Sequence, residues 1–163
     1  MTRRLMTGLA GLLLAGCAGD ERPGDPGTDL ADIAGKRWTV SLVEPVEVGG
    51  PAWPATGADF IVDAASRRAA GTTGCNRWTA GIATDGPGGL RLQGIAATFM
   101  YCAEPVGIME RERELLTALS AVSSYRLSGS DLVLEGDGGT SIRLERGGPA
   151  EAPRVAEANG GEP

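Results

Sequence analysis

The sequence of 163 residues contains no histidine, three cysteines and a single lysine, Lys36. The lack of histidine excludes a Ser-His-Asp triad, a Cys-His dyad and a histidine-ligated metal site. Three cysteines are too few for a four-thiolate zinc or iron–sulfur centre. The net charge is −6, and nucleic-acid binding depends on clustered basic residues. We therefore expect no metal site, no cofactor and no nucleic-acid partner.

The N-terminus has the pattern of an export signal. Arg3 and Arg4 precede an apolar run at residues 5–15, which is shorter than the ~20 residues of a membrane span. The run ends in Leu14-Ala15-Gly16-Cys17, which is similar to a bacterial lipobox. We predict a lipoprotein signal peptide at residues 1–16 and attachment of lipid to Cys17. An ordinary secretory signal is the alternative, and export by either the general or the twin-arginine route stays open.

Composition divides the rest of the chain. Residues 17–29 are rich in Gly, Pro and Asp, which predicts a flexible tether behind the lipid. Residues 147–163 contain one large apolar residue, a valine, and are predicted to be a disordered tail. The domain between them is predicted at residues 30–146, long enough for one modest core.

Short alternating segments dominate this domain, and one segment has helical spacing. Residues 105–122 place apolar side chains at steps of three and four, with Arg111 and Glu114 on the opposite face. A single amphipathic helix must pack on the sheet. The sequence predicts an α+β fold, a strongly curved antiparallel sheet of about eight short strands forming a partial barrel on one helix. The alternating segments are 37–43, 59–63, 76–82, 90–92, 125–127, 132–134 and 141–145.

Five motifs then occur in order. They are Gly35-Lys36-Arg37-Trp38, Gly74-Cys75-Asn76-Arg77-Trp78-Thr79-Ala80-Gly81, Thr98-Phe99-Met100-Tyr101-Cys102, the helical set Met109, Glu112, Leu115, Leu116 and Leu119, and a closing hairpin at Tyr125 and Leu132–Leu134. Together they resemble the META/HslJ family over about residues 30–144. The resemblance implies a curved antiparallel sheet around one helix, no known enzymatic activity, and relatives that include envelope lipoproteins and a heat-shock protein. The fit is loose at residues 47–56 and 67–73.

Cys75 and Cys102 are the two cysteines left after lipidation. In an oxidising compartment they suggest a disulfide between two strands. Two buried free thiols and a redox-active pair are the alternatives, although no C-x-x-C motif is present.

Three further positions have two interpretations each. Asn76, between Gly74 and a strand, is expected to cap nearby backbone rather than to bind a ligand. Glu112 lies on the apolar stripe of the helix and requires a partner such as Arg77 or backbone amides; the alternative is a general acid. Trp53 lies in a loop without a burial pattern and is a candidate partner contact, unless it folds back on the domain. Trp38 and Trp78 are expected in the core.

We expect a non-enzymatic, monomeric lipoprotein of the cell envelope with a stress-related, structural or binding role. No catalytic residues are assigned. Its partners would be membrane lipid, through acylated Cys17, and an unknown envelope protein. Ala18 after the cysteine is typical of outer-membrane lipoproteins facing the periplasm, if the host is Gram-negative. One alternative is an inhibitor of secreted hydrolases such as a lysozyme or protease, favoured by the acidic charge. Another is a thiol oxidoreductase acting through Cys75 and Cys102.

Overall fold

The computed structural model describes residues 29–45 and 53–149. The predicted signal peptide, Cys17 and almost all of the tether lie outside these residues. No helix in the described ranges is long and apolar enough to cross a membrane. The elements are α1 (Leu30–Ile33), β1 (Lys36–Glu44), α2 (Trp53–Thr56), β2 (Asp59–Asp63), β3 (Arg68–Thr72), β4 (Arg77–Ala83), β5 (Arg91–Ala97), α3 (Ile108–Ala121), β6 (Val122–Ser128), β7 (Asp131–Gly136), the 3₁₀ turn η1 (Asp137–Gly139) and β8 (Ser141–Pro149).

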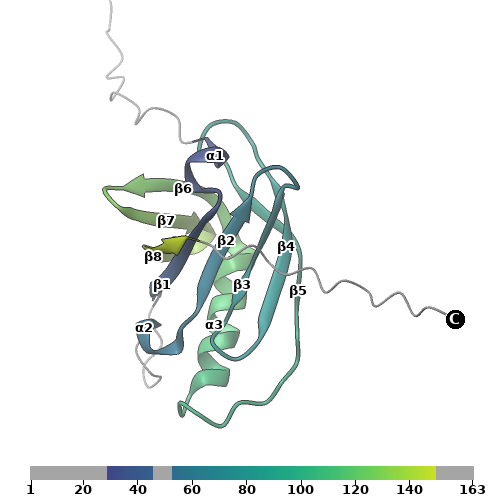
Figure 1. The fold of residues 1–163 in the computed structure, drawn as a ribbon, viewed down its shortest axis with the longest axis vertical. Coiled ribbons are helices and arrows are strands. Elements are labelled where there is room, and N and C mark those ends of the chain that lie inside the picture. The colour runs from purple at the N-terminus through teal and green to yellow at the C-terminus, as the bar shows by residue number, and fades with distance from the viewer. Residues whose placement is uncertain (1–28, 46–52, 150–163) are drawn as a thin grey trace, which may run out of the picture.

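The eight strands form one antiparallel sheet that curls into a half-barrel around α3 (Figure 1). The strand order is β5-β4-β3-β2-β1-β8-β7-β6. At one end the two edge strands almost meet, because an isolated bridge joins Gly89 to Ser124 and the Tyr125 N–H donates to the Gly88 carbonyl at 2.8 Å. The predicted α+β fold with a curved sheet on one helix is confirmed.

The core lies between the concave face of the sheet and α3. Trp38, Phe60 and Trp78 are buried on the sheet side, and Leu115 and Leu119 on the helix side. The indole N–H of Trp38 donates to the Ile33 carbonyl at 2.9 Å, which satisfies its polar atom inside the core. Burying a side chain such as that of Phe60 or Leu115 stabilises the fold by about 1.5–3 kcal/mol. Alternation in β4 and the three–four spacing in α3 therefore identified the core residues. In β1 the expected alternation of Trp38, Val40 and Leu42 holds only as far as Val40, because the register shifts there and Val43 is buried in place of Leu42.

Two boundaries and the burial of one side chain differ from expectation. The helix begins at Ile108 rather than near Pro105, after Gly107 with φ of 85°. Arg111, expected on the outer face, is buried. The last strand continues to Pro149, whose backbone pairs with Lys36, so residues 147–149 belong to the sheet and not to the tail. The backbone of β1 stabilises this extension by pairing with it. A pattern of apolar side chains does not predict such backbone pairing.

Candidate functional site

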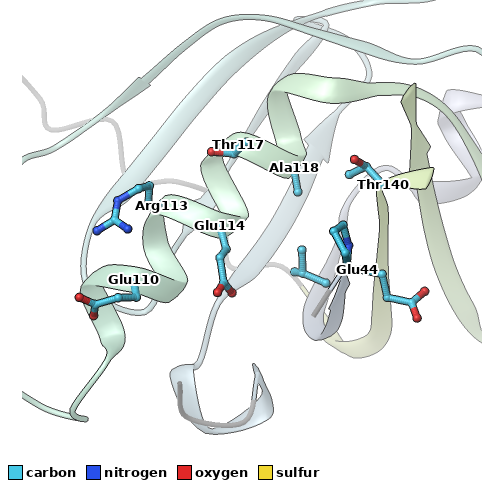
Figure 2. Close-up of a pocket in the computed structure, with 9 residues that line it drawn as sticks. Glu44, Glu110, Arg113, Glu114, Thr117, Ala118 and Thr140 are labelled. Atoms are coloured by element: carbon cyan, nitrogen blue, oxygen red, sulfur yellow. The ribbon is translucent and has the colours of Figure 1, made fainter. Parts of the chain in front are cut away.

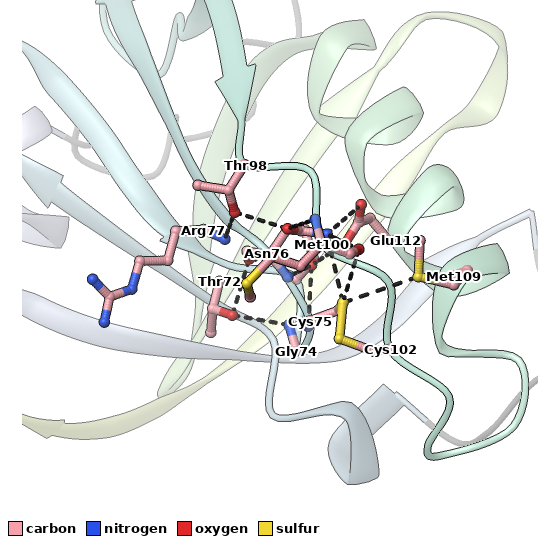
Figure 3. Close-up of a disulfide and its surroundings, with 11 residues drawn as sticks. Thr72, Gly74, Cys75, Asn76, Arg77, Thr98, Met100, Cys102, Met109 and Glu112 are labelled. Carbon is pink, nitrogen blue, oxygen red and sulfur yellow. Dashed lines mark hydrogen bonds between the residues drawn. A yellow bond between two sulfur atoms is a disulfide. The ribbon is translucent and has the colours of Figure 1, made fainter.

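The G-C-N motif forms a tight turn between β3 and β4 at one end of the half-barrel (Figure 3). Gly74 has φ of 97°, and a Cβ built on it would lie 2.2 Å from the Thr56 carbonyl oxygen. Both the backbone conformation and the close approach of the α2 end therefore require glycine. The Thr73 hydroxyl accepts the Asn76 backbone N–H at 2.8 Å and fixes the turn from inside. Thr73 is fully buried, and no motif in the sequence marked it.

The side chain of Asn76 connects three parts of the fold (Figure 3). Its Nδ2 donates to both carboxylate oxygens of Glu112, at 3.0 and 2.8 Å. Its Oδ1 accepts the Met100 N–H at 2.7 Å, and its Nδ2 donates to the Met100 carbonyl at 3.1 Å. The Thr98 hydroxyl also donates to Oδ1, at 2.8 Å. One buried amide thus binds the helix α3 and both backbone groups of a residue in the loop after β5.

Glu112 is buried and accepts hydrogen bonds from the turn between β3 and β4. Besides Asn76, the Thr73 hydroxyl donates to its Oε2 at 2.7 Å. The expected partner was wrong: Arg77 is exposed, and it contributes its backbone N–H to Thr98 Oγ1. A buried carboxylate requires such donors because it has lost its hydration. The geometry is that of a structural carboxylate, in agreement with the first of the two interpretations.

Cys75 and Cys102 form a disulfide in the structure, with the sulfur atoms 2.02 Å apart. It joins the turn before β4 to the loop before α3, and the Met109 sulfur lies 4.0 Å from Cys75 Sγ. The disulfide and Asn76 together attach the segment at residues 98–102 to the barrel end. No cluster of three or more potential metal ligands occurs among the described residues.

Trp53 is not an exposed partner contact. Its side chain is only 4% exposed and belongs to the hydrophobic core. The guanidinium of Arg111 lies over its ring, 5.4 Å from the centroid, and Arg111 Nη1 also pairs with Glu114 Oε2 at 2.6 Å. A cation above an aromatic face is attracted by the ring quadrupole, which explains why both side chains are buried together. Neither partner has a sequence pattern that predicts this pairing.

The exposed apolar surface lies elsewhere, in the loop at residues 98–107 between β5 and α3. Phe99 is 97% exposed, Tyr101 84%, Val106 79% and Met100 55%. Thr98 and Cys102 of this segment stand out in the sequence as motif residues, whereas the aromatic side chains between them do not. The available signal was an apolar run, Phe-Met-Tyr, placed between a strand and a helix and lacking the alternation of either.

A shallow cavity of about 220 Å³ lies between α3 and the adjoining ends of β1 and β8 (Figure 2). Three carboxylates and one guanidinium are among its lining residues, but two of the carboxylates are engaged locally. Glu114 pairs with Arg111, and Glu44 accepts a hydrogen bond from Ser141 at 2.9 Å. The lining residues are Val43, Glu44, Pro45, Glu110, Arg113, Glu114, Thr117, Ala118 and Thr140.

Two titratable side chains are perturbed by burial. Desolvation raises the pKa of Asp59, although the Thr72 N–H and the Arg37 guanidinium act in the opposite direction. Desolvation, followed by the nearby charges of Asp29 and Asp32, raises the pKa of Tyr125 to about 12. Asp59 accepts the Thr72 N–H at 2.8 Å, so its role in the sheet is structural.

These observations define a small half-barrel module with a disulfide-linked, aromatic loop at one end. The sequence matches the META domain family over residues 31–147, more than half of the chain, and the protein belongs to that family. A search of curated proteins finds no match.

Two solved structures share the fold. An NMR structure of a protein from Burkholderia xenovorans superposes with a TM-score of 0.57 at 16% identity, covering 91% of this chain and 99% of that one. A second NMR structure has a TM-score of 0.51 at 20% identity and covers 72% of this chain and 95% of its own. At these identities the likeness concerns the fold alone.

Proposed function

We propose that this protein is a non-enzymatic binding module of the cell envelope, anchored by lipid on Cys17. One observation carries the proposal. Asn76, Glu112 and Thr98 of the family motifs form internal hydrogen bonds, and those bonds hold an exposed aromatic loop in place. Asn76 contacts both Glu112 and the backbone of Met100, so the buried cluster serves the display of that loop.

The state of Glu112 supports a non-catalytic role. A general acid must reach the substrate atom to which it donates its proton, and paired carboxylates in a cleft are the usual arrangement in glycoside hydrolysis. Here the carboxylate is buried and both of its oxygens accept hydrogen bonds from Asn76. The proposal therefore predicts that Glu112→Gln lowers stability. A turnover that E112Q abolishes, with the free energy of unfolding unchanged, would contradict it.

The envelope location rests on the lipobox at residues 14–17 and on the tether that follows it. Two acyl chains anchor a protein firmly, whereas one chain gives marginal binding. In cells fed radiolabelled palmitate, the wild type should be labelled and sediment with the envelope. Cys17→Ala should be unlabelled and absent from the envelope fraction.

The other two cysteines provide the matched control. A chain with C75S and C102S retains Cys17 and should be labelled like the wild type. Labelling that persists in C17A, or an unlabelled wild type, would refute the lipid anchor.

A further inference from the structure

All four large apolar side chains that are exposed in the described ranges lie on one loop, at residues 98–107. Single exposed apolar residues are common on protein surfaces, but a contiguous group marks an interaction site. Phe99 and Tyr101 are two residues apart, which is the spacing of two anchors on one side of an extended chain. Aromatic residues of this kind supply most of the energy in many protein interfaces.

The backbone of this loop is held before any partner arrives. Asn76 binds both the N–H and the carbonyl of Met100, and the disulfide holds Cys102. The Thr98 N–H donates to the Arg77 carbonyl at 2.9 Å, so the chain continues to pair with the start of β4. A preorganised loop loses little conformational entropy on binding, which favours affinity.

The strand that leads into the loop is an edge of the sheet. β5 pairs with β4 on one side. On the other side the described chain pairs only with the residues just before β5, through the bridge of Gly89 to Ser124 and the hydrogen bonds of Leu90 N–H to Ser123 and Tyr125 N–H to Gly88. From Gln93 to Ala97 the strand is exposed apart from the half-buried Ile95, and it has a bulge at Gly94, where φ is 60°. Such an edge is a template for an added strand, because its outward N–H and C=O groups have no strand partner.

Charge and placement favour one kind of occupant. The chain has a net charge of −6, and residues 98–107 contain Glu104 and no basic residue. A second copy of the chain and an anionic membrane surface would both be repelled. The loop also lies at the end of the domain opposite α1, where the chain from the lipid anchor would enter (Figure 1). The loop is therefore remote from the point at which the chain enters the domain.

We propose that β5 and residues 99–101 bind an extended, apolar and non-acidic segment of another protein. The segment adds to β5 as a strand, and its alternate side chains pack on Phe99 and Tyr101. This inference rests on the proposed function as a binding module and names the class of partner.

Selection from a phage library of random twelve-residue peptides on the full, oxidised chain tests the proposal. Enriched peptides should alternate apolar residues and carry more basic than acidic side chains. For a synthetic selected peptide, fluorescence anisotropy should show at least a tenfold loss of affinity with F99S/Y101S. Val106→Ser, in the same loop but outside the β5 continuation, should change the affinity less than twofold. An equal loss for V106S would overturn strand addition.

N-methylation of the selected peptide supplies a readout that is independent of folding in the variants. Methylating alternate amides along one edge should abolish binding, while methylating the other set should preserve it. Equal binding of both peptides, or no alternating peptide in the selection, would overturn the proposal. So would sedimentation with phosphatidylglycerol vesicles, or a dimer that F99S/Y101S dissolves, since each identifies a different occupant. If peptide binding fails while palmitate labelling of Cys17 is intact, this inference alone fails.

Discussion

Replacing Asn76 with alanine is the most direct test of the buried cluster. The change removes the Nδ2 group that donates to both oxygens of the Glu112 carboxylate, at 3.0 and 2.8 Å, and with it the amide that holds the backbone of Met100. It leaves Glu112 buried with the Thr73 hydroxyl as its remaining donor among the contacts described above. The predicted loss of stability therefore comes mainly from a charge that has lost its partner.

The magnitude follows from the burial of each group. A hydrogen bond to a charged group contributes about 1.5–3 kcal/mol, and an unsatisfied buried group costs at least as much. Met100 is 55% exposed, so water can replace the amide at its backbone, and its share of the loss is small. We expect Asn76→Ala to lower the free energy of unfolding by about 3 kcal/mol, a large fraction of the roughly 5–15 kcal/mol typical of a domain.

Urea denaturation followed by tryptophan fluorescence measures this loss on the oxidised chain. With an m-value of about 1–3 kcal/mol/M, the midpoint should fall by about 1–3 M. The same change in the E112Q background should cost only about half as much, because no charge is left to stabilise. An equal loss in both backgrounds would refute the reasoning that Glu112 is the group for which Asn76 is needed.

Three further outcomes are expected. Replacing both cysteines of the disulfide by serine opens a loop with a sequence separation of 27 and should lower stability by about 3–4 kcal/mol in urea denaturation. Gly74→Ala, where Cβ would lie 2.2 Å from a carbonyl oxygen, should cost more than the control Gly129→Ala, which has φ of 64° and no atom within 4 Å of its Cβ; that control should lose about 1–2 kcal/mol. Equal losses in calorimetry would contradict the steric argument. Native Tyr125, with its pKa raised to about 12, holds its proton more tightly than in the unfolded chain, so stability should fall as the pH rises from 10 towards 12. Tyr125→Phe should remove that slope in alkaline urea titrations.

Periodicity predicted the elements that are defined by their own side chains. The segment at 59–63 is β2 with those bounds, and the alternation around Trp38 and Trp78 identified the core faces of β1 and β4. The turn at residues 128–131 joins β6 to β7 as a short hairpin loop. Local patterns succeed here because burial of each side chain follows from its own position in the repeat.

The remaining features depend on contacts between distant residues. The indole of Trp53 is covered by Arg111 from α3, 58 positions later in the chain, and a loop sequence carries no sign of that. Glu112 was expected to pair with Arg77, a charge-based choice, whereas a neutral amide and a hydroxyl supply its donors. Phe99 and Tyr101 are exposed although large apolar side chains are usually buried, and the short run that holds them does not decide between the two. In each case the three-dimensional neighbour decides the outcome.

The pairing of β1 with β8 has a consequence for the order in which this protein can fold. These two strands lie side by side within the sheet, yet they are the first and the last strands of the described chain. The barrel wall cannot close until β8 has been synthesised, and pairings between such distant segments are slow to form. A chain of this topology stays open while its C-terminal strand is still being made.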